Sequence, residues 1–187
     1  MEEKQYKGYL TPTLLNTFVS QDDIMPLLRR DEQETTEAMQ NGLDFENRII
    51  NGEVEELKPL VNGGIYQPCL FKPYKDYILY GFADLIKGFK IYDFKFVKSY
   101  EIGKYRNAVQ HLLYMYCADL NEFEYIIGTK DDFIFYEYYA RDDDKLFEVV
   151  NQFDKWLDIT GNRELYAQNY SIERIKENIY ANHIWWH

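Results

Sequence analysis

The sequence predicts one mixed α/β domain, with a central mixed β-sheet of about five strands flanked by helices. Three observations support this prediction. The chain has 187 residues, about the length of one domain, and is 46% hydrophobic, enough to bury a sizeable core. No repeat or Pro/Gly/Ser-rich linker divides it. Helical periodicity at both ends encloses a middle part rich in aromatic and β-branched residues. We therefore expect helices in 1–60, the sheet with one helix in 61–140, and helices in 141–187.

Helices are predicted first in the N-terminal third. Thr11 followed by Pro12 is typical of an N-cap with proline at the first helical position, and it predicts a short helix through Phe18. A longer helix is expected over 31–50, ending near Gly52. Its apolar positions, which roughly follow a helical period, are Met39, Leu43, Phe45, Ile49 and Ile50.

Strands are predicted in the middle of the chain. The segments 66–74, 77–86 and 89–97 are rich in aromatic and β-branched residues and are separated by turn-forming residues, so they indicate three consecutive antiparallel strands. A helix is expected over 103–120 and two further strands over 123–128 and 133–139. Helical periodicity then returns over 143–159 and 171–181.

Composition excludes several classes of protein. The 32 acidic against 21 basic residues give a net charge of −11, which argues against coating nucleic acid by bulk charge. No window approaches the ~18 apolar residues of a membrane span, and the first ten residues do not resemble a secretory signal. Two cysteines, Cys69 and Cys117, fit no metal or redox spacing. We expect a cytoplasmic protein with no membrane partner.

Charged side chains of the predicted sheet form a candidate site. Asp93 and Lys95 are two residues apart in a strand, so their side chains point to the same face. Asp84 lies on the neighbouring strand, in an otherwise apolar stretch. Glu46 lies among apolar residues of the long helix. Carboxylates in apolar surroundings are costly unless they are paired or bind a metal, and hard oxygen ligands suit Mg²⁺ or Mn²⁺ rather than zinc.

Four motifs in this order resemble a known family. They are Gly42 to Glu46, Gly81-Phe82-Ala83-Asp84, Asp93-Phe94-Lys95 and Gln110-His111-Leu112-Leu113-Tyr114. The set is similar to the PD-(D/E)XK nucleases, and especially to their RecB-like and phage-exonuclease branch, whose first helix the segment Tyr9 to Phe18 also resembles. The resemblance implies a restriction-endonuclease-like core. One departure is the absence of the proline that is common before the residue at Asp84.

The resemblance also implies roles for the catalytic residues. Glu46, Asp84 and Asp93 would hold Mg²⁺ or Mn²⁺ with the main-chain carbonyl of Phe94. Lys95 would orient the attacking water or stabilise the transition state. The iron–sulfur cluster of some relatives needs four cysteines, so the chain is expected to lack it.

A second set of residues is expected to support or bind DNA. Gln110 and Tyr114 share one helix face, and the branch uses them to contact DNA or to brace the catalytic residues. Arg106 would extend that stripe by one turn, although an ordinary polar helix edge explains it equally well. Lys98 and Lys104 belong to a segment, 87–106, with six basic and two acidic residues. His111 lies off the stripe and is expected to be structural. His183 and His187 could suggest a metal site, but terminal exposure or packing of Trp185 and Trp186 is the favoured interpretation.

These features predict a divalent-metal-dependent deoxyribonuclease. We expect an exonuclease or end-processing enzyme of phage or prophage recombination or repair, acting in the bacterial host cytoplasm on linear single- or double-stranded DNA ends. A recombination partner protein and a homo-oligomer stay open. The alternatives are a structure-specific or restriction-type endonuclease and a catalytically silent nuclease fold that acts as an acidic protein-binding or DNA-mimic module. The net charge favours the mimic, whereas the intact acidic and lysine set favours the enzyme. The plainest alternative is a solvated Asp93, an ion-paired Lys95 and an exposed Glu46.

Overall fold

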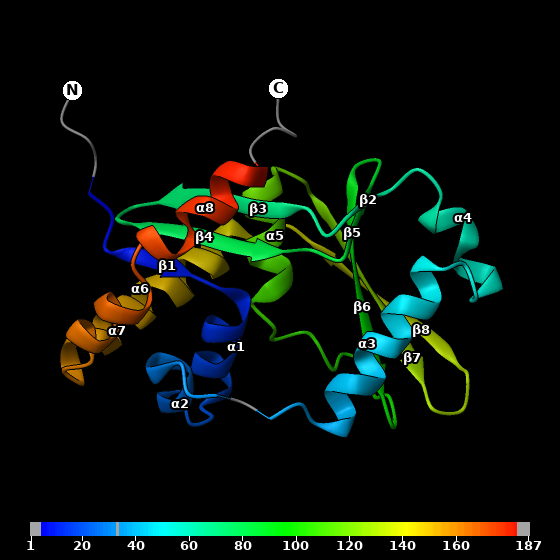
Figure 1. Ribbon diagram of the computed structural model, residues 1–187, viewed down its shortest axis with the longest axis horizontal. Helices are drawn as coiled ribbons and strands as arrows, with labels where there is room; N and C mark the ends of the chain where they lie inside the picture. Colours follow the sequence, from blue (N-terminus) through cyan, green and yellow to red (C-terminus); the bar gives the residue numbers. More distant parts are fainter. Residues whose placement is uncertain (1–4, 33, 183–187) are drawn as a thin grey trace.

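The computed structural model describes residues 5–32 and 34–182, in which helices flank two β-sheets (Figure 1). The strands are Gly8–Leu10 (β1), Ile65–Tyr66 (β2), Cys69–Tyr74 (β3), Tyr77–Phe82 (β4), Leu85–Lys87 (β5), Lys90–Val97 (β6), Glu122–Thr129 (β7) and Ile134–Ala140 (β8). The helices are Pro12–Ser20 (α1), Met25–Arg29 (α2), Glu37–Ile50 (α3), Glu55–Leu57 (η1, a 3₁₀ turn), Lys58–Val61 (α4), Gln110–Ala118 (α5), Asp143–Ile159 (α6), Arg163–Asn169 (α7) and Glu173–Asn182 (α8). His183 and His187 lie outside the described residues.

The two sheets divide strands that the sequence predicts as continuous. One sheet has three strands in the order β1-β4-β3, and the other has five in the order β2-β5-β6-β7-β8. The predicted strand 66–74 is therefore two strands, β2 and β3, and the predicted strand 77–86 is likewise β4 and β5. The predicted mixed sheet is present, because β6 and β7 are parallel while the other pairs of the five-stranded sheet are antiparallel.

The two strand breaks lie side by side, and backbone hydrogen bonds connect them. Gln67 has a left-handed backbone, with φ at 44°, and Pro68 follows it. The Gln67 N–H donates to the carbonyl of Asp84 at 3.0 Å, and the Ala83 N–H donates to the carbonyl of Pro68 at 3.3 Å. We call these two bends, 67–68 and 83–84, the seam between the sheets.

The N-terminal helices follow the capping signals of the sequence. The Thr11 side chain accepts from the Leu14 N–H and caps α1, as predicted. Helix α3 begins later than the predicted residue 31, because the Thr36 side chain caps it through the Met39 N–H. Met39 and Leu43 are half exposed, so the predicted apolar face is narrower and depends mainly on the buried Phe45 and Ile49.

Two hydrophobic clusters hold the sheets and helices together. The larger one packs α1, α5, α6 and α7 around the three-stranded sheet and reaches β6 and β7. The smaller one lies between α3 and the other face of the five-stranded sheet, and its buried members are Phe45, Ile49, Leu57, Leu85, Phe94 and Ile126. Figure 1 shows α3 in front of β6 and β7. The five-stranded sheet is therefore covered on both faces near β6.

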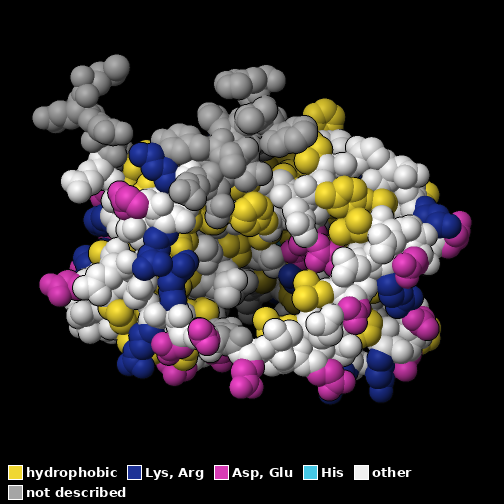
Figure 2. Space-filling view, in the orientation of Figure 1, with side chains coloured by type: hydrophobic (Ala, Val, Ile, Leu, Met, Phe, Trp, Pro, Cys, Tyr) yellow, Lys and Arg dark blue, Asp and Glu magenta, His cyan; other side chains and the backbone are white. Residues whose placement is uncertain are grey.

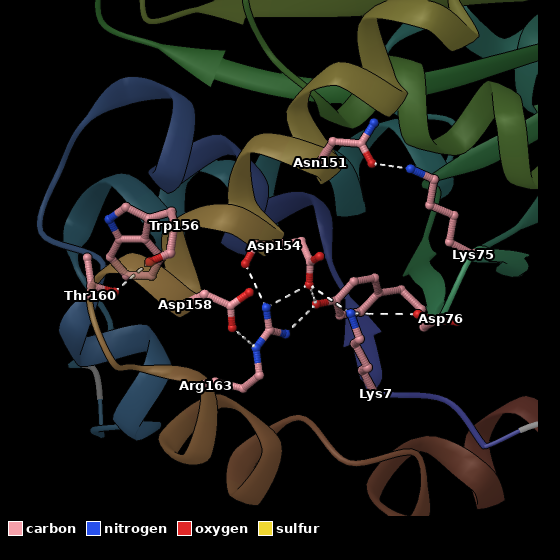
Figure 3. A network of polar contacts seen from close by, with 10 residues as sticks. Lys7, Lys75, Asp76, Asn151, Asp154, Trp156, Asp158, Thr160 and Arg163 are labelled. Atoms are coloured by element: carbon pink, nitrogen blue, oxygen red, sulfur yellow. Dashed lines mark hydrogen bonds and ion pairs between the residues drawn. The ribbon is translucent and has the colours of Figure 1, made fainter.

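A polar network fixes the C-terminal helices on the three-stranded sheet (Figure 3). Arg163 opens α7, a helix that the sequence analysis did not predict, and donates to Asp154 and Asp158 of α6. It also donates to the Tyr77 hydroxyl of β4 at 3.0 Å. Lys7 pairs with Asp154 at 3.3 Å. The Arg163 guanidinium, at the start of α7, therefore links α7 to α6 and to β4 through separate hydrogen bonds.

The remaining sequence predictions concern membranes and thiols. In the described part of the chain, no helix is both long enough and apolar enough to cross a membrane. Cys69 and Cys117 are free thiols. Burial raises the pKa of Cys69 to about 11 and that of Cys117 further still, so both are poor nucleophiles at neutral pH.

The buried His111 of α5 provides a test of the packing around β7 and β8. Its ring stacks on Tyr139 with centroids 4.2 Å apart, as expected for a structural residue. Burial, followed by the Lys145 charge, lowers the His111 pKa to about 4. Because the unfolded histidine, with a pKa of about 6.5, takes up its proton first, stability should fall as pH drops from about 6.5 to 4, by about 3 kcal/mol. His111→Phe should lose this pH-dependent part of the stability. Urea titrations at about pH 7.5 and 4.5 should then give a smaller difference in unfolding free energy between the two pH values than for the wild type. An unchanged difference would contradict the assignment.

Candidate functional site

Strand β6 separates polar and apolar side chains onto its two faces. Tyr92, Phe94 and Phe96 face α3, while Asp93 and Lys95 face the side of α5. The Lys95 Nζ lies 2.5 Å from the Asp93 Oδ2, and the Asp93 side chain is only 1% exposed. The predicted shared face is therefore observed. A buried carboxylate needs such a partner, because an unpaired charge in the interior is costly.

Asp84 belongs to the seam, immediately before β5. Leu85 pairs with Tyr92 in the β5–β6 ladder, so the next residues outward, Asp84 and Asp93, face each other. The Asp84 Oδ2 accepts a hydrogen bond of 2.6 Å from the Phe94 N–H. Burial and then the charge of Asp93 raise the pKa of Asp84 to about 8. Two facing buried carboxylates cannot both ionise without a large cost in free energy, so the pair resists carrying two negative charges in the ion-free protein.

The charges of all three acidic residues act on Lys95. Burial alone would lower its pKa, but the carboxylates of Asp93, Asp84 and Glu46 together raise it above the ordinary value. The ammonium therefore stays charged. It also lies 5.8 Å from the centroid of the Tyr125 ring, and Asp93 and Tyr125 are register partners on β6 and β7.

Glu46 reaches the site from α3. Its side chain is half-buried, and its Oε1 accepts a hydrogen bond of 3.1 Å from the Gln67 Nε2. Its charge acts on Asp84, Asp93 and Lys95. The helix therefore presents this carboxylate toward the seam.

The three carboxylates do not yet converge on one point. Among residues 5–32 and 34–182, no three His, Cys, Asp or Glu side chains are arranged to hold one metal ion. Asp84 is bound to the Phe94 N–H, Asp93 to Lys95 and Glu46 to Gln67. The buried Asp93 Oδ2 nevertheless receives no hydrogen bond within the described chain besides its ion pair with Lys95. An under-satisfied buried oxygen beside two more carboxylates is a donor set that fits a hard divalent cation.

Gln110 and Tyr114 brace the site from α5. The Gln110 Nε2 donates to the Asp93 Oδ1 at 2.7 Å, and the Tyr114 hydroxyl donates to the carbonyl of Phe82 at the end of β4. Tyr114 also packs on Gly81, where an added Cβ would come within 2.8 Å of its ring. Because Tyr114 is buried, bracing rather than DNA contact is the role this geometry provides.

The basic residues follow β6 in a loop, and one prediction about them is wrong. Helix α5 begins at Gln110, not at residue 103, so Arg106 is in a turn and does not extend the Gln110–Tyr114 stripe. Lys98, Lys104 and Arg106 are exposed in this segment, 98–109. We call it the basic loop.

Two residues that the sequence analysis missed hold the basic loop. Glu137 on β8 is buried and accepts from the hydroxyls of Tyr100 (2.7 Å) and Tyr139 and from the N–H groups of Gly103 (3.0 Å) and Tyr105 (3.3 Å). These hydrogen bonds lower the pKa of Glu137 despite its burial. Within the loop, the Arg106 and Ala108 N–H groups donate to carbonyls three residues back, so the segment forms turns in place of the predicted helix.

The second missed residue caps α5 from a distance. The Asn16 Oδ1 on α1 accepts the Val109 N–H at 2.5 Å. No spacing rule links positions 16 and 109. For Glu137, the lone acid in the aromatic run 133–139 was an available signal, since a charge there needs buried donors.

The surface of the protein has a depression near the candidate site. Figure 2 shows a depression between the region of α1 and that of α3, with acidic side chains at its edge over β5 and β6. Within the site, the Lys95 side chain is 29% exposed, and Glu46 and Asp84 are half-buried. Solvent therefore reaches part of the site.

The Glu137 hydrogen bonds predict how the basic loop responds to mutation. Glu137→Gln keeps the shape but turns an amide donor toward the loop N–H groups, so it should lower the unfolding free energy by about 2–3 kcal/mol. Hydrogen exchange at the Gly103 and Tyr105 amides should become faster. Glu122→Gln, at an exposed position of the neighbouring strand, should change stability by less than about 0.5 kcal/mol. Equal effects of the two substitutions would show that Glu137 does not hold the loop.

The fold has counterparts among solved structures. LHK-Exo, an alkaline exonuclease from Laribacter hongkongensis, matches with a TM-score of 0.58 and 16% identity over 92% of this chain and 95% of its own. The structure of LHK-Exo in complex with dAMP matches with a TM-score of 0.59 and 14% identity, again over 92% of this chain and 95% of its own. A protein from Eubacterium rectale, provisionally described as an exonuclease, matches with a TM-score of 0.53 and 12% identity over 87% of this chain and 82% of its own. No family model and no curated protein matches the chain. At these identities the likeness shows the fold, and it confirms the predicted fold class.

Proposed function

We propose that this chain is a divalent-metal-dependent nuclease that hydrolyses phosphodiester bonds of DNA at the seam. The observation that carries the proposal is the facing pair Asp84 and Asp93, with Lys95 on Asp93 at 2.5 Å and Glu46 turned toward them. This arrangement places buried acids, a cation and access from solvent together. The nuclease-like fold supports it.

The acids are assigned as the metal ligands. Asp84, Asp93 and Glu46, with the main-chain carbonyl of Phe94, would hold Mg²⁺ or Mn²⁺, for which hard oxygen donors are suited. A bound ion supplies an acidified water and offsets the negative charge of the phosphate. A bound cation would favour the ionised form of both aspartates, because it would offset the burial and the neighbouring charge that raise the pKa of Asp84.

Lys95 and Gln110 would complete the chemistry. Lys95 keeps its charge beside Asp93, so it can orient the attacking water and stabilise the charge that develops on the phosphate. Gln110 holds the other Asp93 oxygen at 2.7 Å and fixes the direction of the carboxylate. Both are preorganised by β6 and α5, which are rigid elements.

DNA would be bound locally, against the overall charge of −11. The basic loop offers Lys98, Lys104 and Arg106 to phosphates, and Glu137 fixes its conformation before DNA arrives. The exonuclease assignment rests on the fold shared with LHK-Exo. Linear DNA ends of phage or prophage recombination or repair are the substrate we infer, in the host cytoplasm.

The DNA-mimic alternative places different demands on the same acids. A mimic presents carboxylates to its partner in place of phosphates, so they must be exposed. Asp93 is 1% exposed and Asp84 is half-buried. Their burial favours a catalytic site over a mimicking surface.

Two substitutions at the site test the enzyme assignment. Asp93→Asn keeps the shape and the Gln110 contact but removes ligand charge, so cleavage of end-labelled linear DNA in Mn²⁺ should collapse. Lys95→Ala should keep ion binding and lower the cleavage rate by ~10²–10³. Asp44→Asn, on the exposed side of α3, is the control and should cleave like the wild type.

The outcomes separate the candidate functions. A wild type that leaves linear single- and double-stranded DNA intact in Mn²⁺ would overturn the enzyme proposal. Nicking of covalently closed circles at the rate of linear DNA would replace the exonuclease by an endonuclease. Full activity of Asp93→Asn would remove the seam from the mechanism.

A further inference from the structure

Gln67 contacts two parts of the candidate site at once. Its side-chain Nε2 donates to the Glu46 Oε1 at 3.1 Å, and its main-chain N–H donates to the carbonyl of Asp84 at 3.0 Å. These two acids come from α3 and from the seam, elements that no ladder connects directly. Within the described residues, the Gln67 amide is the hydrogen-bond donor to the Glu46 carboxylate.

The backbone of Gln67 is unusual for its residue type. Its φ of 44° is left-handed, a conformation that costs a non-glycine residue about 1 kcal/mol or more. Glycine would adopt it without strain. A glycine would lack the side-chain hydrogen bond to Glu46, which is the contact that distinguishes Gln67 at this position.

The chemistry of the amide suits a ligand that must keep its charge. A lysine or arginine at this position would neutralise Glu46 and compete with a cation. An amide N–H orients the carboxylate through one hydrogen bond and leaves the negative charge and the second oxygen free for binding. Partners of this kind, behind the ligands themselves, orient metal-binding carboxylates and typically contribute ~10–100-fold to affinity.

We propose that Gln67 is a positioning residue that aims Glu46 at a divalent cation held by Asp84 and Asp93. The proposal rests on the proposed function, because Glu46 is assigned there as a ligand. It adds a residue outside the four motifs and states how α3 is coupled to the seam. In this proposal Gln67 acts on the ion through Glu46.

Two variants and a matched control separate positioning from folding. Gln67→Met keeps the length of the side chain but removes the donor. Gln67→Gly removes the side chain while relieving the left-handed backbone, so its fold should be retained. Gln40→Met removes the same kind of bond, from Gln40 to Asp44 at 2.8 Å on the exposed side of α3.

The measurement is the rise in melting temperature with increasing Mn²⁺, alongside the Mn²⁺ dependence of DNA cleavage. Without metal, Gln67→Gly should melt at or above the wild-type temperature. Both Gln67 variants should need ~10-fold more Mn²⁺ for half of the melting shift and half of the cleavage rate. Gln40→Met should match the wild type.

Each outcome bears on a different claim. A wild type with no Mn²⁺-dependent melting shift and no cleavage would overturn the proposed function, and this inference with it. A wild type that binds Mn²⁺ and cleaves DNA, beside a Gln67→Gly variant with the same Mn²⁺ midpoints, would overturn this inference alone.

Discussion

The structure depends on the seam, where two strands bend at the same level and pass from one sheet to the other. The bends are joined by hydrogen bonds from Gln67 to Asp84 and from Ala83 to Pro68. Asp84 lies in the bend between β4 and β5. Its carboxylate can therefore accept a hydrogen bond from the Phe94 N–H and still face Asp93. An unbroken strand would place Asp84 within a regular ladder. The bends therefore create the place where acidic side chains meet.

Burial at the seam gives these acids their properties. Helix α5 covers Asp93 through Gln110 and Tyr114, and α3 brings Glu46 from the other side. The apolar surroundings that raise the pKa of Asp84 to about 8 also make a cation beside the pair favourable. Lys95 meets part of that need in the ion-free protein. The buried acids therefore lower the stability of the ion-free fold while providing affinity for a cation. Strongly shifted pKa values of this kind are common at functional sites.

Sequence reasoning succeeded where local rules decide the structure. The Thr11-Pro12 cap, the shared face of Asp93 and Lys95, and helix α6 follow from capping, strand alternation and helical periodicity. It failed where distant residues decide. Residues 103–109 have a helical pattern but form turns, and the distant Glu137 and Asn16 accept the N–H groups of Gly103, Tyr105 and Val109. The seam depends on Gln67 pairing with Asp84, 17 positions away, and on Pro68 pairing with Ala83, 15 positions away, which no local signal reports.

The central claim is that the acids of the seam hold a divalent cation where DNA is cleaved. Anomalous diffraction from crystals soaked in Mn²⁺ tests it most directly, because the signal locates the ion itself. The account predicts one peak within about 2–2.5 Å of carboxylate oxygens of both Asp84 and Asp93, with the Glu46 oxygen that Gln67 leaves free as the third carboxylate ligand. A peak elsewhere, or none at a Mn²⁺ concentration that supports cleavage, would contradict the account.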